Sequence, residues 1–325
     1  MAYHAELVLI LAALLDYGIG DPWGLWHPVQ GMGWLISLYT QQAFRMFKSP
    51  IALRLTGIGL GVGLVLGIGL AGWLMVTVAK SVHPVVGLAT ELILLASCFA
   101  GRSLRDAAEE VIQSLQAGDL ARSRSRLSRY VGRDTENISV PEVLRAVLET
   151  VTENATDGVM APLFYAIVGA MIPAIGSVPL ALSYKAASTL DSMVGYRETP
   201  YTHLGWFSAK LDDVLTWLPC RLVVLTISIL SGRPRRIWQI CWRDAPKDLS
   251  PNSGWSEAAY AAALGVQVGG TNWYGGVAKQ KPLLGDANEA IALNHIFAAL
   301  RLTRQCFVIW LVIAVSALWL GAQLD

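Results

Sequence analysis

Residues 149–158 read ETVTENATDG and gather carboxylate and amide side chains directly before an uncharged segment at residues 161–183. Glu149 and Glu153 are four residues apart, so on a helix they share one face, and Asp157 falls within the same broad stripe. Hard oxygen ligands of this kind suit Mg²⁺ and its phosphate substrates. The alternative is a solvated acidic helix end, and the residues alone leave both interpretations open.

The residues before this stretch predict a helix. Ser139, Pro141 and Glu142 form a capping-box pattern with proline in the first turn. Helical spacing then continues to Gly158. No lysine or arginine follows Glu149 or Glu153 by four residues, so the usual surface ion pairs are missing and external cations are expected.

A second group of reactive residue types occupies residues 184–197, YKAASTLDSMVGYR. It begins where the uncharged segment ends and holds Lys185, Asp191 and Arg197. Lysine and arginine at such a position can clamp phosphate oxygens. The alternative is that Lys185 and Arg197 reach toward the membrane interface with their long side chains.

A third group combines Asp212 and Asp213 with Arg221, which lies beside Pro219 in an apolar run. Charges inside a membrane are costly and are usually paired or functional. An ion pair between Asp213 and Arg221 is the structural interpretation, and it would leave Asp212 available as a ligand.

Two loops complete the candidates. Residues 20–29 (GDPWGLWHPV) hold His27 between a tryptophan and a proline, where a fixed imidazole could bind substrate or transfer a proton. A lone histidine is more often structural. Residues 250–255 (SPNSGW), which include Asn252, supply a turn and an aromatic platform that either lines a bulky ligand's site or packs.

The composition indicates a membrane protein. Only 15% of the 325 residues are charged, against about a quarter in soluble proteins, and the mean hydropathy is +0.47. A net charge of +1 without a basic tract excludes a nucleic-acid partner. Four scattered cysteines without a CxxC pair indicate buried thiols rather than a disulfide framework or a zinc site.

A membrane-spanning helix needs roughly 20 apolar residues. The candidates are residues 55–79, 85–100, the proline-broken 161–183, 214–230 and 306–320, with 7–15 as a short first stretch. We therefore expect an all-α polytopic integral membrane protein, with about four to five transmembrane helices and helical cytoplasmic segments. One membrane-embedded domain over residues 1–325 would include a helical extramembrane segment (101–160) and a polar loop region (232–304). The arginine-rich residues 102–130 favour the cytoplasmic side.

Five motifs occur in one order across nearly the whole chain. They are GDPWGLWHPV, ENATDGVMAPLFY, YKAASTLDSMVGYR, AKLDDVLTWLPCRL and SPNSGW. Together they resemble the adenosylcobinamide-phosphate synthase family, the CobD/CbiB proteins of cobalamin biosynthesis. The resemblance implies a multi-pass inner-membrane ligase whose site faces the cytoplasm. Its partners would be the lipid bilayer, its substrates and other membrane enzymes of the corrinoid pathway.

The reaction that the resemblance implies joins aminopropanol or aminopropanol phosphate to adenosylcobyric acid, with ATP as co-substrate and Mg²⁺ as cofactor. The expected metal ligands are Glu149, Glu153, Asp157 and Asp212. The expected catalytic residues are Lys185, Asp191 (also named as a candidate metal ligand), Arg197 and His27, and the expected cofactor-binding residues are Asn154, Arg221 and Asn252. Thr216, Cys220 and the pair Ser256–Glu257 depart from the family pattern, which leaves the substrate preference open.

The competing interpretation is a non-enzymatic membrane protein, either a transporter or a signalling protein of the AmpE type. Broken helices and intramembrane charges are also features of transporters. However, the sequence shows no matching pair of interrupted segments in two halves, and its acidic groups cluster at segment ends. These observations favour the enzyme.

Overall fold

The computed structural model describes residues 4–20 and 27–324, and the chain forms two compact units. Unit 1 consists of Met1–Ala100, Ala161–Thr216 and Ile309–Asp325. Unit 2 consists of Gly101–Met160 and Trp217–Val308. Two helices, α10 (Trp206–Leu230) and α13 (Leu293–Leu324), contribute residues to both units.

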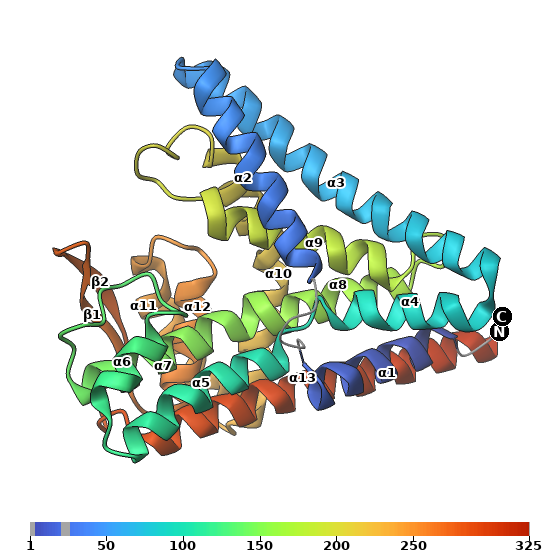
Figure 1. Ribbon diagram of the computed structural model, residues 1–325. Coiled ribbons are helices and arrows are strands. Elements are labelled where there is room, and N and C mark those ends of the chain that lie inside the picture. Colours follow the sequence, from blue (N-terminus) through green and yellow to red (C-terminus); the bar gives the residue numbers. More distant parts are fainter. Residues whose placement is uncertain (1–3, 21–26, 325) are drawn as a thin grey trace. The chain divides into compact units, whose positions relative to one another are not determined.

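Unit 1 is helical, and α9 (Ser177–Val194) is its central element. Helix α9 packs against four other helices, and Figure 1 shows it beside α3. These four are α2 (Pro28–Met46), α3 (Pro50–Val82), α4 (Pro84–Ala96) and α8 (Ala161–Ala170). Helix α1 (His4–Gly18) packs against α4 and α8.

The contact between α3 and α9 depends on small residues. A Cβ atom at Gly69 would lie 2.2 Å from the hydroxyl oxygen of Ser183, and one at Gly72 would lie 2.5 Å from a methyl carbon of Leu182. Glycine at both positions therefore lets the two backbones approach closely, which is the usual way for helices to associate in lipid.

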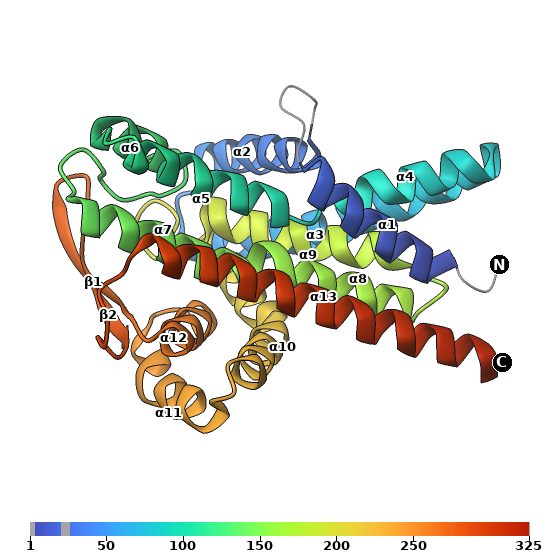
Figure 2. The same ribbon diagram turned by 90° about the horizontal axis from the view of Figure 1, so that it is seen from below.

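Unit 2 combines helices with one β-hairpin. Its helical elements are α5 (Gly101–Gln116), α6 (Leu120–Leu127), α7 (Val140–Asn154), the π-helix η1 (Ala155–Met160), α11 (Pro234–Asp244), the short 3₁₀ helix η2 (Ala245–Lys247) and α12 (Ser253–Leu264). Helix α12 packs against α7, α11 and both strands, and Figure 2 shows it beside α11. Nearly every residue of α12 is buried, so it forms the core of this unit.

The hairpin pairs β1 (Gln267–Tyr274) with β2 (Val277–Gly285) in antiparallel register, with an irregularity between Val268 and Gly270. Gly275 and Gly276 form the two-residue turn, and both have positive φ, as a type I′ turn requires. Their amides donate to the two carboxylate oxygens of Asp134 at 2.9 and 2.8 Å, which fixes the turn. The segment 232–304, expected to be a polar loop region, thus holds α11, α12 and this hairpin.

The expected all-α polytopic membrane protein is confirmed, with the hairpin as a small addition. Three helices of the described part are long and apolar enough to cross a membrane, namely α3, α10 and α13. A fourth span results if α4 and α5 together form one broken span. The proline-broken segment at residues 161–183 is divided between α8 and α9, and α1 has only 15 residues.

The arginine-rich segment at residues 102–130 is largely engaged by local partners. Arg126 and Arg129 both pair with Glu110, and Arg124 donates to the carbonyl oxygen of Ile138 at 2.8 Å. These contacts join α5 and α6 to the loop before α7. Structure within unit 2 therefore accounts for three of the arginines, independently of any contact with lipid headgroups.

Asp244 joins α11 to the end of the hairpin and gives a first testable prediction. It is buried, and it accepts hydrogen bonds from Arg243, Lys247 and the backbone amide of Gly285. Burial alone would raise the pKa of this carboxyl, but the hydrogen bonds outweigh it and hold the pKa at about 2. Because the ordinary value of 3.8 applies in the unfolded chain, the stability that Asp244 contributes is present above about pH 4 and lost toward pH 2.

We expect Asp244→Asn to lower the melting temperature at pH 7 by at least a few degrees, since roughly 1 kcal/mol shifts it by ~2–4 °C in a domain of this size. The difference between variant and wild type should shrink as the pH falls from 4 to 2. Thermal unfolding in detergent followed by circular dichroism measures both effects. Asp286→Asn, which removes a more exposed partner of Arg243, is the matched control and should change little. An unchanged melting temperature for Asp244→Asn would contradict the assignment.

Candidate functional site

The acidic stretch lies at the end of α7 and in the π-helix that follows. The predicted capping box is present, because the amide of Ser139 donates to Glu142 Oε2 at 2.7 Å. The helical path does not stop at Gly158 but continues through η1, which contains Asp157. Short π-helical turns are frequent at functional sites because the extra residue redirects the side chains of that turn.

Glu149 pairs with two arginines, and both precede it in the sequence rather than following it by four residues. Arg133 Nη2 lies 2.5 Å from Glu149 Oε2, and Arg145, four residues earlier, places Nη1 3.3 Å from Oε1. The amide of Gly269 also donates to Oε1 at 2.9 Å. The Glu149 side chain is 1% exposed. The expected lack of internal cations is therefore wrong for Glu149, and its neutralised carboxylate does not fit a metal ligand.

The same two arginines hold the hairpin against α7. Arg145 Nη2 donates to the carbonyl oxygen of Thr271 at 2.9 Å and to Asn272 Oδ1 at 3.0 Å. Arg133 Nη1 donates to the same amide oxygen of Asn272 at 2.9 Å. Glu149 is therefore the anion that balances two guanidinium groups at the junction of α7 and β1.

A buried ion pair lies close to this network and was not among the predicted residues. Lys281 Nζ of β2 is 3.2 Å from Glu257 Oε1 of α12. Burial raises the pKa of Glu257, the Lys281 ammonium opposes this rise, and Glu153 and Glu149 add to it. Burial opposes the charge on Lys281, but the carboxylates of Glu257, Glu153 and Glu149 outweigh it and raise the lysine's pKa. Lys281 thus faces several acidic groups.

Arg221 is held by aromatic rings rather than by an acid. Its guanidinium carbon lies 5.1 Å from the ring centre of Trp217 and 4.5 Å from that of Trp255, and Nη1 donates to Asn252 Oδ1 at 2.9 Å. In the part of the chain that the structure describes, no carboxylate lies within ion-pair distance of Arg221. The alternative pair with Asp213 does not form, because eight helical residues separate the two by about 12 Å.

Further aromatic rings surround this arginine. Trp238 and Trp242 pack edge-on against Trp255, with ring centres at 5.6 and 5.1 Å. Trp255 is buried, whereas Trp217 and Trp242 are 51% and 66% exposed. Arg221 therefore lies beside exposed aromatic surface and, in the described part of the chain, is held by aromatic rings and an amide rather than by an ion pair, an arrangement in which a guanidinium can bind an anion.

Three of the five sequence motifs meet around this arginine within unit 2. The Thr156 and Ser256 hydroxyls are hydrogen-bonded at 2.8 Å, and Ser256 donates to the carbonyl oxygen of Thr152 at 2.6 Å. The Cys220 thiol donates to the carbonyl oxygen of Asn252 at 3.3 Å. Asp157 lies close enough to Cys220 for an electrostatic interaction. ENATDG, LPCR and SPNSGW thus form one candidate site.

The two other predicted site residues of unit 2, Glu153 and Asn154, differ in burial. Glu153 is half-buried and lies near the Glu257–Lys281 pair. Asn154 is exposed, and its amide donates back to the carbonyl oxygen of Thr150 at 2.9 Å, so its side chain follows its own helix. Whether Asn154 contacts a nucleotide stays a prediction.

Unit 1 contains a second acidic group. Asp212 of α10 has one buried carboxylate oxygen that finds no hydrogen-bond partner among the residues the structure describes, and Asp191 of α9 and Asp213 lie close enough to interact with it electrostatically. Asp213 also pairs with Lys210 at 3.0 Å. The predicted metal ligands are therefore divided between the units, with Asp212 in unit 1 and Glu149, Glu153 and Asp157 in unit 2.

The predicted basic residues of unit 1 differ in burial. Lys185 is half-buried in α9 and lies close enough to the Cys98 thiol for an electrostatic interaction. Arg197 is exposed in the turn after α9, where its carbonyl oxygen accepts from the Thr202 hydroxyl at 3.1 Å. Their proposed role toward phosphate stays a prediction.

The position of Asp191 depends on Gly195. A Cβ atom at residue 195 would lie 1.9 Å from Asp191 Oδ1 and 2.7 Å from the Asp191 carbonyl oxygen. We therefore expect Gly195→Ala to displace the Asp191 carboxylate and the last turn of α9, and, if Asp191 has the catalytic role predicted from the sequence, to reduce turnover by roughly tenfold or more, as small misplacements of reacting groups do. Steady-state product formation measures the effect. Gly63→Ala, where the new methyl group meets no atom within 4 Å, is the control; equal activity of both variants would contradict the expectation.

His27 has a local structural role. It is the N-cap of α2, its Nδ1 accepts from the amide of Val29 at 3.2 Å, and its own amide donates to the Gln30 side chain at 3.3 Å. This geometry matches the structural interpretation of a lone histidine. Residues 21–26 of the same motif lie outside the described residues.

Within residues 4–20 and 27–324, no group of three or more His, Cys, Asp or Glu side chains is placed to hold a metal ion. This pattern is compatible with Mg²⁺, which proteins usually bind through one or two carboxylates while substrate phosphates and water complete the shell. Whether Asp157 and Glu153 take that limited role stays a prediction. All four cysteines are free and buried, as the sequence predicted.

Comparisons with known proteins agree with this arrangement of motifs. The family model described as CobD/Cbib protein matches residues 9–303. The chain is 50% identical to the cobalamin biosynthesis protein CobD of Synechocystis sp. over 97% of this chain and 92% of that protein. It is 41% identical to CobD of Citrobacter koseri (97% and 99% covered) and 40% identical to CbiB of Salmonella typhimurium (96% and 97%).

No solved structure matches the chain significantly. The agreement of the family model and the relatives over nearly the whole length is decisive: this chain belongs to the CobD/CbiB family.

Proposed function

We propose that this protein acts in cobalamin biosynthesis as an ATP-dependent ligase, which joins aminopropanol or aminopropanol phosphate to adenosylcobyric acid through an amide bond. The relatives' names support the pathway. The observation that supports the reaction type is the convergence of Asp157, Asn252 and Arg221 in one part of unit 2, where Arg221 forms no ion pair with a described residue. An anionic substrate and a nucleotide both require such a cationic group.

The chemistry explains why a nucleotide is needed. A carboxylate does not condense with an amine in water, because its oxygen is a poor leaving group. Transfer of a phosphoryl or adenylyl group from ATP to the carboxylate oxygen forms a mixed anhydride and releases ADP or pyrophosphate. The amine then attacks the carbonyl carbon, the C–N bond forms, phosphate or AMP leaves, and the amine nitrogen loses a proton.

The protein's own residues would position these groups and balance their charge. Arg221, with Lys185 and Arg197 as further candidates, would bind phosphate or the developing negative charge. Asn252 holds the Arg221 guanidinium in place. Mg²⁺, when bound, would neutralise the triphosphate, and Asp157 and Glu153 are the residues of unit 2 that fit as its ligands.

The experiment uses the full-length protein purified in detergent, with Mg²⁺, ATP, adenosylcobyric acid and aminopropanol phosphate. We expect the amide product by mass spectrometry, with stoichiometric release of either ADP and phosphate or AMP and pyrophosphate. Folded protein that yields neither product nor nucleotide cleavage, with either amino alcohol, would refute the proposal. A transporter or AmpE-type signalling protein would give that negative result.

Two substitutions test the acidic residues. Glu153→Gln and Asp191→Asn keep size and hydrogen bonding but remove the charge, so we expect both to abolish turnover and leave thermal unfolding unchanged. Glu136→Gln, at an exposed position of unit 2, is the control. If both variants keep full activity, the assignment of these carboxylates to metal or catalysis is wrong, even if the ligase activity is present.

A further inference from the structure

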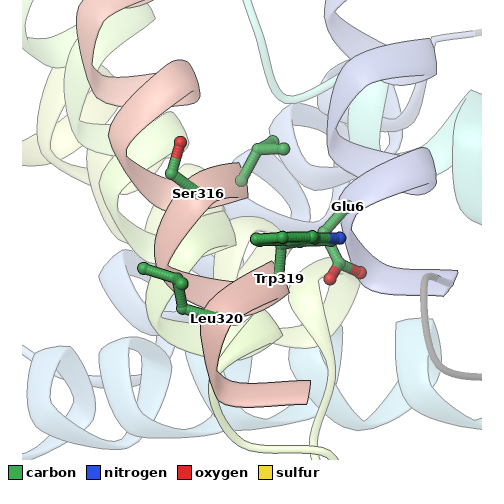
Figure 3. A pocket seen from close by; sticks show the side chains of 5 residues that line it. Glu6, Ser316, Trp319 and Leu320 are labelled. Atoms are coloured by element: carbon green, nitrogen blue, oxygen red, sulfur yellow. The ribbon is translucent and has the colours of Figure 1, made fainter. Parts of the chain in front are cut away.

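Unit 1 contains a pocket of about 330 Å³ between the start of α1 and the last part of α13. Its lining consists of Glu6, Val315, Ser316, Trp319 and Leu320. Figure 3 shows the Trp319 ring and the Glu6 carboxylate projecting into the same space. None of these residues belongs to the motifs or to the acidic groups described above.

Glu6 is the unusual member of this lining. Only 7% of the residue is exposed, its carboxylate oxygens are open to the pocket rather than sealed in the protein, and within residues 4–20 and 27–324 they form no hydrogen bond or ion pair. A carboxylate that is shielded from bulk water and has no partner is stabilised when a cation binds beside it. The carboxylate faces the pocket, so the partner that it lacks among the described residues can be supplied there by a ligand.

The other lining residues indicate what kind of ligand the pocket can hold. Trp319 presents an indole ring, whose face attracts ammonium groups. Val315 and Leu320 add apolar surface for a short carbon chain, and Ser316 adds a hydroxyl. A pocket of this volume is at the lower end of the ~300–1,000 Å³ range of ligand sites, which is too small for a corrin ring.

The pocket lies near the end of unit 1 where charged groups collect. His4 Nε2 of α1 is 2.6 Å from Glu91 Oε2 of α4, and Lys80 Nζ of α3 is 2.7 Å from Glu91 Oε1. Charged side chains of membrane helices gather at the level of the lipid headgroups or at functional sites. Glu6 lies two residues along α1 from His4, close along the chain to these charged groups.

We propose that the pocket formed by Glu6 and Trp319 binds a primary ammonium group on a short, partly apolar chain. Two sources carry this chemistry, the headgroup of phosphatidylethanolamine and a free amino alcohol. In both, the ammonium would lie between the Glu6 carboxylate and the Trp319 ring. This inference does not depend on the proposed ligase activity, because it concerns binding alone.

The first arm of the test uses the full-length protein in nanodiscs with equal amounts of phosphatidylethanolamine, phosphatidylcholine and phosphatidylglycerol. Native mass spectrometry then measures which lipid is retained. Wild type should retain phosphatidylethanolamine preferentially, and Glu6→Gln should reduce this preference by roughly tenfold, the effect expected for loss of a desolvated charge partner. The second arm titrates aminopropanol or ethanolamine calorimetrically into protein in phosphatidylcholine nanodiscs. Glu6-dependent binding there identifies the free amine as the source.

Trp319→Leu should weaken binding in whichever arm is positive, by roughly threefold to tenfold. Trp73→Leu is the matched control, since Trp73 is a similarly exposed tryptophan on another apolar helix and should leave binding unchanged. The proposal is overturned if no ammonium ligand binds in either arm. It is also overturned if Glu6→Gln binds as wild type does, or if phosphatidylglycerol is retained as well as phosphatidylethanolamine. Turnover assays on the same variants keep this outcome separate from that of the ligase.

Discussion

Glu149→Ala is expected to lower the free energy of unfolding by about 3–5 kcal/mol, the cost of removing one partner from a buried ion pair. Arg133 and Arg145 are only 9% and 16% exposed, and they would keep their charges without the carboxylate that balances them. The hairpin amide of Gly269 would lose its acceptor as well. The effect should therefore spread to the contact between α7 and β1.

Denaturant titration in mild detergent, followed by circular dichroism, measures this loss. Glu136→Ala changes an exposed glutamate of the same unit and should stay within about 0.5 kcal/mol of wild type. A metal ligand would behave differently: the wild-type protein would lose stability on chelation, and Glu149→Ala would be insensitive to it. If Glu149→Ala unfolds like wild type in the absence of metal, the structural interpretation of Glu149 fails.

Helix starts and apolar helices, which depend on local sequence signals, were predicted correctly from the sequence. The start of α7 follows from Ser139, Pro141 and Glu142, and the apolar runs locate α3, α10 and α13. Both kinds of signal lie within a few residues or within one helix, so a pattern in the sequence is enough to predict them.

The partners of Glu149 show where such reasoning ends. Arg145 could have been found by looking four residues back as well as forward, since both directions share a helix face. Arg133 lies outside the helix, and Gly269 comes from a hairpin 120 residues later. The strands of that hairpin are rich in glycine and lysine, so they lack the alternation of apolar residues that predicts a strand.

The contacts of Arg221 are partly local in sequence and partly long-range. Trp217 is four residues before Arg221 on the same helix, so their contact can be predicted from the sequence. Trp255 and Asn252 reach Arg221 only because α12 packs nearby, and the sequence does not predict that. The sequence identified the arginine as functional or paired. In the structure Asp213 pairs with Lys210 instead, and Arg221 lies among aromatic rings without an ion pair to any described residue.

Arg221→Gln is therefore expected to reduce turnover by roughly 100-fold or more, in the range found when one donor to a developing charge is removed. Unfolding should change little, because no carboxylate in the described part of the chain depends on this guanidinium. Arg221→Lys keeps the charge but loses the planar group that lies between Trp217 and Trp255, so it should recover only part of the activity.

Steady-state kinetics with ATP and with the corrinoid varied in turn would show which substrate Arg221 contacts, because binding to one of them raises only that substrate's KM. Arg235→Gln, at an exposed position of α11, is the matched control and should behave as wild type. Full activity of Arg221→Gln would exclude this arginine from the site. A loss of activity accompanied by unfolding would instead assign its role to the packing of Trp217 and Trp255, and the proposed anion site would have to be abandoned.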